Sequence, residues 1–322
     1  MVRTDLVQTQ QIDGTLGYAG SFTVVGRTQG TVTWLPPAGQ VIGRGNRVYA
    51  VDGTDIPLLY GRTPFYRRLG VGVQDGPDVR VLETNLKALG YGADLSVDRH
   101  FSSATADAVR AWQHDLGRAE TGAVDAVDAV VEPGAVRVSA PVGIVGAAAT
   151  GDLLALTGTE RVVTVAMPVD QEQLARHGTS VRVELPDGST TGGRITDVGT
   201  VAQAPQGSGT AQSGQTPTQA ATISVRAALT DPGAASSLDG APVSVAFTSD
   251  RHDNVLAVPV SALLALAEGG YAVETVSPAG RAAPEEQATR LVPVKLGAFA
   301  EGKVEVSGAG LREGMAVEVP SS

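Results

Sequence analysis

The residue types that most often perform catalysis are few in this 322-residue sequence, and they form no recognisable site. There is no cysteine, which excludes a thiolate nucleophile, a thiolate metal site and a disulfide. The four histidines, His100, His114, His177 and His252, lie far apart and lack the HExxH spacing of a zinc peptidase. A Gly-x-Ser-x-Gly nucleophile elbow and a phosphate-binding loop are both missing. The sequence therefore predicts a protein that is not an enzyme, with no catalytic residue, no metal site and no cofactor.

Charge and composition narrow the class of protein further. With 24 basic and 34 acidic residues, the formal net charge is −10, and an acidic surface repels phosphate backbones, so no nucleic-acid partner is expected. Hydrophobic residues make up 42% of the chain, with 40 glycines and 18 prolines, which indicates packed cores built from short elements and turns. No run approaches the roughly 20 apolar residues of a membrane span. The first residues also lack the apolar core of a signal peptide, so the protein is either cytosolic or has an N-terminal signal or anchor outside the sequence given, and the family resemblance described below favours the second.

The periodicity of apolar residues changes twice along the chain. Residues 12–57 alternate with period two, as β-strands do, and the β pattern returns after Pro133. Between about Gly76 and Gly117 the period is helical, and two helices are predicted over about 78–90 and 103–116. Segment 203–220 contains only Gln, Ala, Pro, Gly, Ser and Thr, which predicts a flexible loop. Clear strands are expected at 161–165, 181–185, 222–225, 243–247 and 255–258.

Two segments on either side of the helical region are alike. Residues 39–48 and 145–154 each place a turn glycine three residues before the apolar residue that begins the next strand. This spacing resembles the two half-motifs of a lipoyl-type domain, or barrel-sandwich hybrid. Carrier domains of that type bear their cofactor on a lysine, but the first lysine in this chain is Lys87, outside both halves. A scaffold role is therefore expected in place of a carrier role.

A split lipoyl-like domain followed by a β-barrel resembles the HlyD/MacA-like membrane fusion proteins, the periplasmic adaptor subunits of efflux and ABC export systems. Segments 255–263, 269–273, 291–297 and 310–317 follow in the order that this family shows in its membrane-proximal domain. The resemblance implies a mainly β, multidomain fold. The domains expected are N-terminal strands that join the membrane-proximal domain (1–27), a first lipoyl-like half with its connection (28–69), an α domain (70–132), a second lipoyl-like half (133–160), a β-barrel (161–250) and a membrane-proximal β domain (251–322).

The inserted α domain departs from the long helical hairpin of Gram-negative adaptors and resembles a peptidoglycan-binding domain. The resemblance lies in residues 78–80, Leu82-Glu83, Leu86, Leu89-Gly90-Tyr91, Val97-Asp98, Phe101, Thr105, Ala108-Val109, Trp112-Gln113, Leu116-Gly117 and Thr121-Gly122. Glu83 stands where glutamine is usual, and Asp98 to Ser102 replace an Asp-Gly-x-Phe-Gly turn. The resemblance makes Asp98, Phe101, Trp112 and Gln113 the candidate contacts to peptidoglycan. The structural alternative for each is a core position for Trp112 and a turn-holding role for Asp98 and Gln113.

The two resemblances together imply a non-catalytic extracytoplasmic adaptor in the cell envelope of a thick-walled, actinobacterial cell. Its expected partners are an inner-membrane transporter permease, of the MacB-like ABC type, and peptidoglycan, and self-association as a homo-oligomer is left open. The sequence also leaves open two alternatives: a structural or binding protein anchored in the cell wall, and a regulatory subunit of a peptidoglycan hydrolase.

Overall fold

The computed structural model describes residues 1–93, 95–203, 221–231, 233, 239–276 and 289–319. Residues 204–220 of the segment expected to be a flexible loop lie outside this range. The chain divides into two compact units, one of residues 18–161 and one of residues 1–17 together with 162–322. Most elements are strands, and the only α-helices in the described part of the chain lie between strands of the first unit, so the mainly β, multidomain fold class is confirmed.

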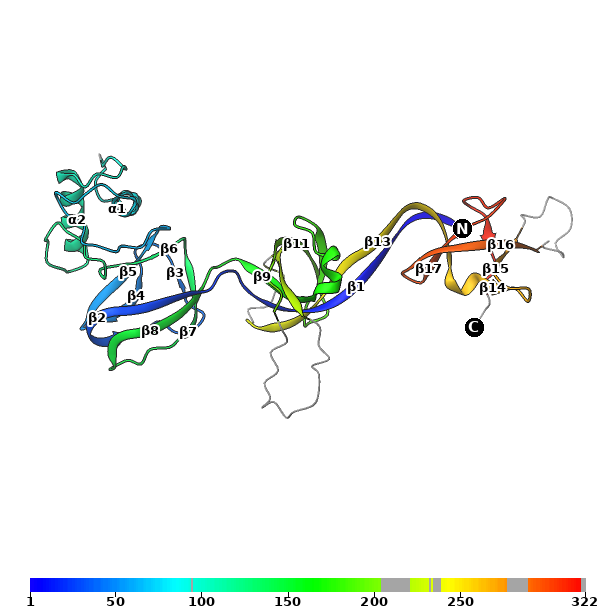
Figure 1. The fold of residues 1–322 in the computed structure, drawn as a ribbon, viewed down its shortest axis with the longest axis horizontal. Coiled ribbons are helices and arrows are strands. Elements are labelled where there is room, and N and C mark those ends of the chain that lie inside the picture. Colours follow the sequence, from blue (N-terminus) through cyan, green and yellow to red (C-terminus); the bar gives the residue numbers. More distant parts are fainter. Residues whose placement is uncertain (94, 204–220, 232, 234–238, 277–288, 320–322) are drawn as a thin grey trace. The chain divides into compact units, whose positions relative to one another are not determined.

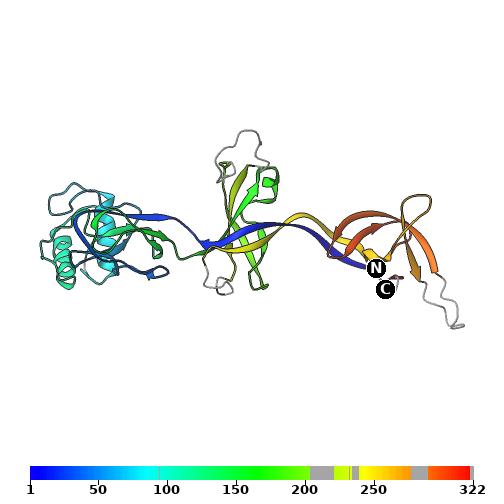
Figure 2. The ribbon, with the colours of Figure 1, turned by 90° about the horizontal axis from the view of Figure 1, so that it is seen from below.

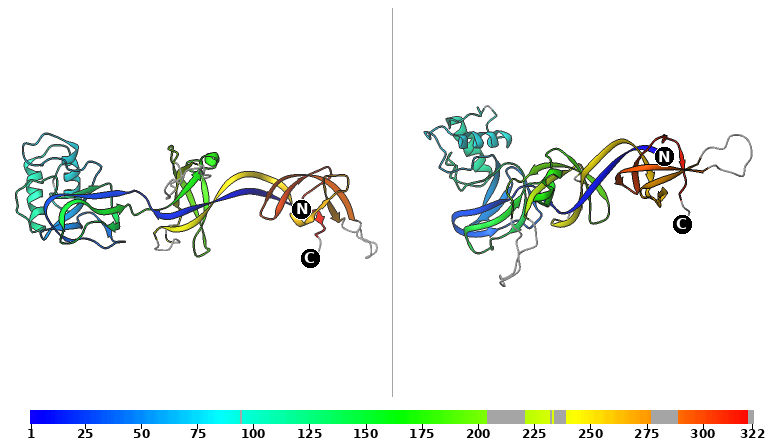
Figure 3. Two further views of the ribbon diagram at one scale, coloured as in Figure 1. Left: turned by 60° about the horizontal axis from the view of Figure 1, so that its bottom comes forward. Right: turned by 45° about the vertical axis from the view of Figure 1, so that its right-hand side comes forward.

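The unit of residues 18–161 contains one seven-stranded sheet and two helices. Its elements are β2 (Phe22–Trp34), β3 (Val41–Ile42), β4 (Arg47–Val51), β5 (Thr54–Tyr60), α1 (Pro77–Ala88), α2 (Ser103–Asp115), β6 (Val130–Glu132), β7 (Val136–Pro141) and β8 (Ala148–Thr157). Across the sheet the strands follow the order β3, β7, β8, β2, β4, β5, β6. Strands from before and after the helices therefore belong to one sheet, with β7 and β8 lying between β3 and β2, while α1 and α2 lie together beside it (Figures 1 and 3).

A single hydrophobic core joins the two parts of this sheet. Alternation within β7 buries Val136 and Val138 and leaves Arg137 between them less buried, as a half-buried strand requires. The same cluster takes side chains from residues 24–58 on one side of the insertion and 136–156 on the other. Neither part has this core without its partner, so the β domain is one folding unit that the helical segment interrupts.

The insertion leaves and re-enters the sheet at neighbouring strands. β5 and β6 pair in parallel, with Leu58 opposite Val130 and Tyr60 opposite Glu132. The Asn85 side chain fixes the end of β5, where the chain leaves the sheet. Its amide accepts from the backbone N–H of Tyr60 and donates to the Tyr60 carbonyl, both at 2.8 Å. The chain ends of the insertion are therefore close enough for a short connection to replace it.

Removing the insertion is expected to leave the rest of the chain folded. A Gly/Ser linker of about eight residues in place of 62–128 would reach the roughly 14 Å between residues 61 and 129 that the parallel pairing of β5 and β6 requires. Leu59 packs in the core of the insertion and should be changed to Thr in the same variant. Thermal unfolding followed by circular dichroism and Trp34 fluorescence should remain cooperative. A broad, non-cooperative transition would contradict the split-domain interpretation.

The second unit begins with a closed barrel. Its first elements are β1 (Val2–Tyr18), β9 (Arg161–Pro168), a 3-10 helix (Val169–Leu174), β10 (Ser180–Glu184), β11 (Thr190–Val198), β12 (Thr222–Leu229) and β13 (Ala241–Pro259). The pairing order β1, β9, β12, β11, β10, β13 returns to β1, because β1 also pairs with β13. Figure 2 shows β1 in blue beside β13 in yellow. Closure leaves no free edge in this ring of strands.

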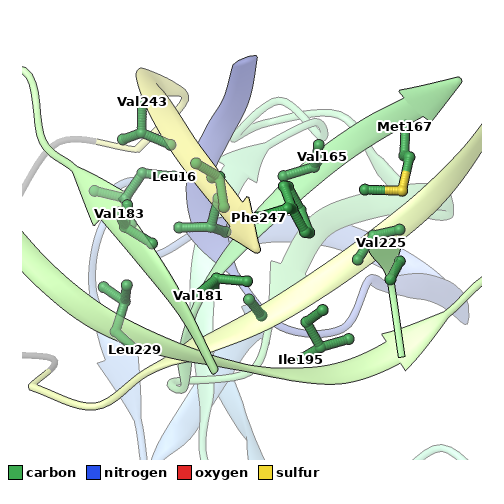
Figure 4. Packing of buried hydrophobic residues seen from close by; sticks show 14 of the residues in the cluster. Leu16, Val165, Met167, Val181, Val183, Ile195, Val225, Leu229, Val243 and Phe247 are labelled. Carbon is green, nitrogen blue, oxygen red and sulfur yellow. The ribbon is translucent and has the colours of Figure 1, made fainter. Parts of the chain in front are cut away.

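Side chains from all six strands fill the barrel. Leu16, Val165, Val183 and Phe247 point into one cluster (Figure 4), and each is almost fully buried. Val243, Val245 and Phe247 alternate with less buried residues along β13, the period-two pattern expected of a strand with one face on a core. The barrel is therefore held by an aliphatic core around one aromatic ring.

Two strands that the sequence predicted as separate form one continuous strand, so that strand boundary was wrong. Segments 243–247 and 255–258 both belong to β13, which bends where Asn254 adopts a positive φ of 54°. Asp5 on β1 accepts from the Asn254 backbone N–H at 2.9 Å and pairs with Arg251 at 3.2 Å. The polar residues between 247 and 255 therefore form a bend within one strand, and β1 stabilises that bend through Asp5.

The strands after β13 form the remaining part of the second unit. They are a 3-10 turn (Val260–Ala262), β14 (Leu263–Ala265), β15 (Tyr271–Val276), β16 (Thr289–Ala300), β17 (Lys303–Ser307) and β18 (Ala316–Val317). β17 pairs with the end of β13, and β16, β15 and β14 follow in order, with β18 on β15. Their separate core contains Val258, Val273, Val304 and Val306, with Met1 packed against it.

Candidate functional site

The inserted domain is built on two short, well-capped helices. α1 has Gly76 at its N-cap and Pro77 at the first helical position, where a missing N–H costs nothing. Gly90 follows its last turn with φ 94°, and the Tyr91 N–H returns to the Leu86 carbonyl at 2.9 Å. This is a Schellman ending, which requires the positive φ that glycine adopts easily. The start and end that the sequence indicated for this helix are confirmed.

α2 begins at a capping box. The Ser102 hydroxyl accepts from the Thr105 N–H at 3.1 Å, and the Thr105 hydroxyl accepts from the Ser102 N–H at 3.2 Å. Ser102 occupies the second glycine position of the usual turn, with an ordinary φ of −83°. Arg99, in the first glycine position, is not among the residues with positive φ either. The turn therefore does not need glycine at these two positions, and Ser102 instead caps α2.

Three of the four predicted contact residues lie in the interior of the domain. Phe101 is 2% exposed and Trp112 is 3% exposed, and both pack in the core with Val79, Leu82 and other residues of the two helices. The Gln113 side chain donates to the Ala123 carbonyl at 2.8 Å and accepts from the Gly122 N–H at 2.9 Å. These three side chains fix the positions of α2 and of the loop after it.

Asp98 is the predicted contact residue whose side chain is exposed. Its carboxylate accepts from the His100 N–H at 2.6 Å, which closes a tight turn before Phe101. Its own N–H donates to Glu83 at 2.9 Å. Asp98 therefore both shapes the turn and presents a carboxylate to solvent.

Glu83 links this turn to α2 from inside the domain. It is 1% exposed, and it accepts from the Asp98 N–H and, at 2.8 Å, from the Thr105 hydroxyl. Burial raises the pKa of Glu83, and the two hydrogen bonds oppose that effect only in part. The position between α1, the turn and the cap of α2 makes Glu83 the internal support of the surface around Asp98.

A shallow groove follows this surface, and its lining is mostly charged. It is lined by Asp75, Arg80, Val97, Asp98, Arg99 and His100, from the start of α1 and from the turn. His100 lies 2.9 Å from the Asp75 carboxylate through Nδ1, and this hydrogen bond, with the charge of Asp75, raises the pKa of His100. We name these six residues the charged groove.

Arg80 and Arg99 give the charged groove its capacity to bind anions. Within the described part of the chain, neither guanidinium has a hydrogen-bond or ion-pair partner, and both side chains are exposed. Guanidinium groups bind carboxylates through two parallel hydrogen bonds. Asp98 and the Asp75–His100 pair add acceptors and a donor, so the groove can bind a polar ligand that carries carboxylate, amide and hydroxyl groups.

One buried ion pair supports the first turn of α1 behind the charged groove. Asp78 has a fully buried side chain, and Arg67 binds it through Nε at 2.7 Å and Nη2 at 2.9 Å. Burial alone raises the pKa of Asp78, but the hydrogen bonds and charge of Arg67 outweigh it and hold that pKa below its ordinary value. Arg67 also donates to the Gln74 carbonyl at 2.7 Å, next to Asp75.

Glu83→Gln is expected to raise the free energy of unfolding of the domain by about 1 kcal/mol at pH 7. The amide keeps the acceptor for Asp98 and removes a buried carboxylate that has no cation bonded to it. The pKa of Glu83 is raised in the folded state, so Glu83 makes the domain less stable as pH rises above the ordinary value of about 4.3. The stability gained by Glu83→Gln should therefore appear above about pH 4.3 and vanish below it. Urea unfolding at several pH values would measure this difference.

Glu83→Ala is the matched control. It leaves the Asp98 N–H without an acceptor and removes the buried acceptor of the Thr105 hydroxyl, and a loss of about 2 kcal/mol is expected. A glutamine variant that is as unstable as the alanine variant would show that the negative charge is required.

The sequence alone singled out Asp98 but not Asp75, Arg80 or Arg99 as groove residues. The available signal was weak: Arg99 replaces a turn glycine and must be exposed there, while Arg80 stands opposite the apolar stripe of α1. In the described ranges, no group of three or more His, Asp or Glu residues could hold a metal ion. No helix among the described residues is long and apolar enough to cross a membrane.

A family model with the description "Putative peptidoglycan binding domain" matches residues 75–127. The match begins at Asp75 and ends before β6, so it contains both helices and the whole charged groove. No curated protein matches the chain.

Several solved structures are similar to the chain over most of its length. MacA from Actinobacillus actinomycetemcomitans is 12% identical, with a TM-score of 0.49, over 99% of this chain and 98% of that one. ZneB from Cupriavidus metallidurans is 16% identical, with a TM-score of 0.40, over 98% and 89%. The membrane fusion protein Spr0693 from Streptococcus pneumoniae R6 is 11% identical, with a TM-score of 0.37, over 75% and 99%.

Proposed function

We propose that the chain is a non-catalytic, extracytoplasmic adaptor of a transmembrane export system, and that residues 75–127 hold it at the cell wall. The observation that carries the wall-binding part is the family match over a domain that interrupts one β core. The order of the parts supports the adaptor role: a split lipoyl-like domain, then a closed barrel, then a further β domain. This is the order that the sequence resemblance to membrane fusion proteins implies.

In this proposal the charged groove binds the peptide stems of peptidoglycan. Stem peptides carry carboxylates, which suit Arg80 and Arg99, and amides, which suit the exposed carboxylate of Asp98. Phe101, Trp112 and Gln113 act indirectly, by fixing the turn and α2. The groove is open and charged, so binding should weaken with ionic strength.

The double variant Arg80→Gln/Arg99→Gln is expected to reduce binding of the full chain to purified peptidoglycan about tenfold. Co-sedimentation at low and high salt would measure it, and peptidoglycan with amidated carboxyl groups should bind the unaltered chain equally weakly. Arg110→Gln is the control, since Arg110 is exposed on α2 outside the groove and pairs with Asp107. Unchanged binding in the double variant would contradict the groove as the site.

The proposal extends to the partner and the place of action. An ABC permease of the MacB-like type, in the cytoplasmic membrane of a thick-walled actinobacterial cell, is the proposed partner, and an N-terminal segment beyond the sequence given is the proposed anchor. The helices of 12 and 13 residues are each about 20 Å long, too short for a hairpin that reaches an outer-membrane channel. The adaptor would act by binding one permease conformation better than another, as a homo-oligomer or a monomer.

Two deletions test the adaptor role together. Removal of residues 62–128 should impair wall attachment and export but leave stimulation of permease ATPase activity. Removal of residues 260–322, which keeps the β1–β13 ladder, should abolish stimulation. Recovery of the chain from native membranes with a wall hydrolase and without any permease would instead support a regulatory subunit of that hydrolase.

A further inference from the structure

The bend in β13 separates the part of that strand that closes the barrel from the part that pairs with β17. Asn254 at the bend has a positive φ of 54°, which is uncommon for a residue other than glycine. The register with β1 shifts at the same place, between Leu6 and Thr4. β17 pairs with β13 only beyond the bend, at residues 257–259. The bend therefore joins the barrel to the last strands of the second unit.

One side chain spans this bend. His252 lies before the bend, and its Nδ1 is 2.8 Å from the carboxylate of Glu305, which stands on β17 opposite Ala257. Its Nε2 is 3.1 Å from the carboxylate of Asp250. The imidazole is 34% exposed and the Glu305 side chain 21%, so water only partly surrounds their contact. Both ring nitrogens therefore face a carboxylate, one on each side of the bend. We name Asp250, His252 and Glu305 the histidine bridge.

β16 holds the Glu305 carboxylate in position for this contact. The same oxygen, Oε2, accepts from the Ala298 N–H at 3.1 Å, where the β16–β17 ladder has a register shift between Leu296 and Phe299. Gly297 leaves room for the carboxylate, because a Cβ at that position would overlap it. The acceptor on the β17 side is therefore fixed by the backbone of β16 and does not depend on His252.

The two contacts of His252 require two protons on its ring. Ionised carboxylates only accept hydrogen bonds, and a neutral imidazole has a single N–H, so it can donate to one carboxylate and not to both. The imidazolium ion donates to both. The hydrogen bond to Asp250, and the charges of Glu305 and Asp250, raise the pKa of His252, although partial burial opposes the shift. The hydrogen bond from His252 also lowers the pKa of Asp250.

Other charged side chains near the histidine bridge do not supply this effect. They are Arg251 and Asp253 on β13, Arg3 and Asp5 on β1, Lys303 on β17 and Lys295 on β16. Arg251 is paired with Asp253 and Asp5. In the part of the chain that the structure describes, neither lysine forms an ion pair with Glu305. The charge on His252 therefore depends on Asp250 and Glu305.

From the bend, the two distances and the number of protons that the hydrogen bonds need, we propose that the histidine bridge is a pH-sensitive link between the barrel and the strands that follow it. The imidazolium form fastens β13 before the bend to β17. The neutral form loses one of the two hydrogen bonds, so the bend opens more often. This inference does not rest on the proposed adaptor function.

The direction of the pH effect follows from the raised pKa. A group whose pKa is higher in the folded state stabilises that state below its ordinary pKa, which for histidine is about 6.5. The contribution is lost as pH rises through the folded pKa. The link is therefore closed in acid and weakened in alkali.

NMR titration of ring-labelled histidine in the full chain tests the charge on the bridge. We expect His252, assigned from the spectrum of His252→Gln, to titrate above the ordinary value of about 6.5. Asp250→Asn and Glu305→Gln should each lower its pKa, and Glu305→Gln keeps an acceptor for the Ala298 N–H. Asp107→Asn, which changes an exposed carboxylate of α2 in the other unit, is the control and should have no effect.

Hydrogen exchange tests whether the charge controls the bend. Peptides that cover residues 250–259 and 303–307 would be compared about one pH unit below and above the measured pKa of His252, with rates corrected for the pH dependence of unstructured amides. Protection should be about two- to fivefold lower at the higher pH. His252→Gln, whose amide does not titrate, should show equal protection at both pH values.

Three results would each overturn the proposal. The first is a His252 that titrates at about 6.5 in the full chain. The second is a protection of the bend that is equal on both sides of the measured pKa. The third is a pH dependence of that protection that persists in His252→Gln, because another group would then control the bend.

Discussion

Replacing Asp78 by alanine is expected to lower the free energy of unfolding of the inserted domain by about 3 kcal/mol. The change removes a fully buried carboxylate that accepts from Nε and Nη2 of Arg67 and from the Val79 N–H. Removing one partner of a buried ion pair leaves the other partly desolvated without compensation, and a cavity at the first turn of α1 adds to the loss. Fluorescence of Trp112 in a Trp34→Phe background would report on this domain alone, because these are the only two tryptophans.

The pH dependence gives an independent check on the Asp78 pair. Because the folded pKa of Asp78 is lowered, its stabilising contribution is present above the ordinary pKa near 3.9 and is lost as pH falls through the folded pKa. The alanine variant should therefore approach the unaltered chain in stability below about pH 4. Asp107→Ala, which removes an exposed carboxylate of α2, is the control and should change little. An Asp78 variant as stable as this control at pH 7 would contradict the structural role of the pair.

The helices of the insertion were predictable because local chemistry determines them. Pro77, Gly90 and Ser102 mark boundaries that depend only on neighbouring backbone groups, and the apolar spacing of Val79, Leu82 and Leu86 repeats on one face. The full lengths of β2 and β13 were not predictable in the same way. Both strands contain polar stretches that break the apolar alternation. These stretches still form strand because β1 and β8, far away in the sequence, supply their hydrogen-bond partners.

The candidate site was less predictable than the fold around it. A family pattern records residues that hold a domain together as well as those that touch a ligand, and Phe101, Trp112 and Gln113 fall in the interior. The groove residues Asp75 and His100 are 25 positions apart and meet only because the Asp98 turn folds back on the start of α1. The proximity of such residues depends on tertiary structure, which no local spacing encodes.

Contacts at the base of the insertion bear on how a wall-bound domain could act on the rest of its unit. Asn85 of α1 is hydrogen-bonded to the Tyr60 backbone, and Leu59 of β5 packs into the core of the insertion. Arg118, after α2, donates to the Asp55 carbonyl of the same strand. The insertion is therefore fastened to β5 at three points, and force applied to the charged groove would reach the β core through that strand.

The largest effect of a single substitution is expected in the barrel, where Phe247→Ala should cost about 3–5 kcal/mol. Phe247 is 1% exposed at the centre of the cluster in Figure 4, and its ring contacts side chains from several strands of the closed ring. Removing it leaves a large cavity that six mutually paired strands cannot close by a local shift. Thr248→Ala, the next residue on the exposed face of β13, is the matched control and should change little.

The two tryptophans make the Phe247 prediction specific to one unit. Both lie in residues 18–161, so Phe247→Ala should lower the unfolding midpoint seen by far-ultraviolet circular dichroism and leave the midpoint seen by tryptophan fluorescence unchanged. Asp78→Ala should instead lower the midpoint seen by fluorescence and that of the circular dichroism signal of α1 and α2, and leave the midpoint of the barrel strands unchanged. The opposed pattern is expected because the two units have separate hydrophobic cores, each with its own cooperative transition. A fluorescence midpoint that falls together with the circular dichroism midpoint in Phe247→Ala would show that the chain unfolds as one unit.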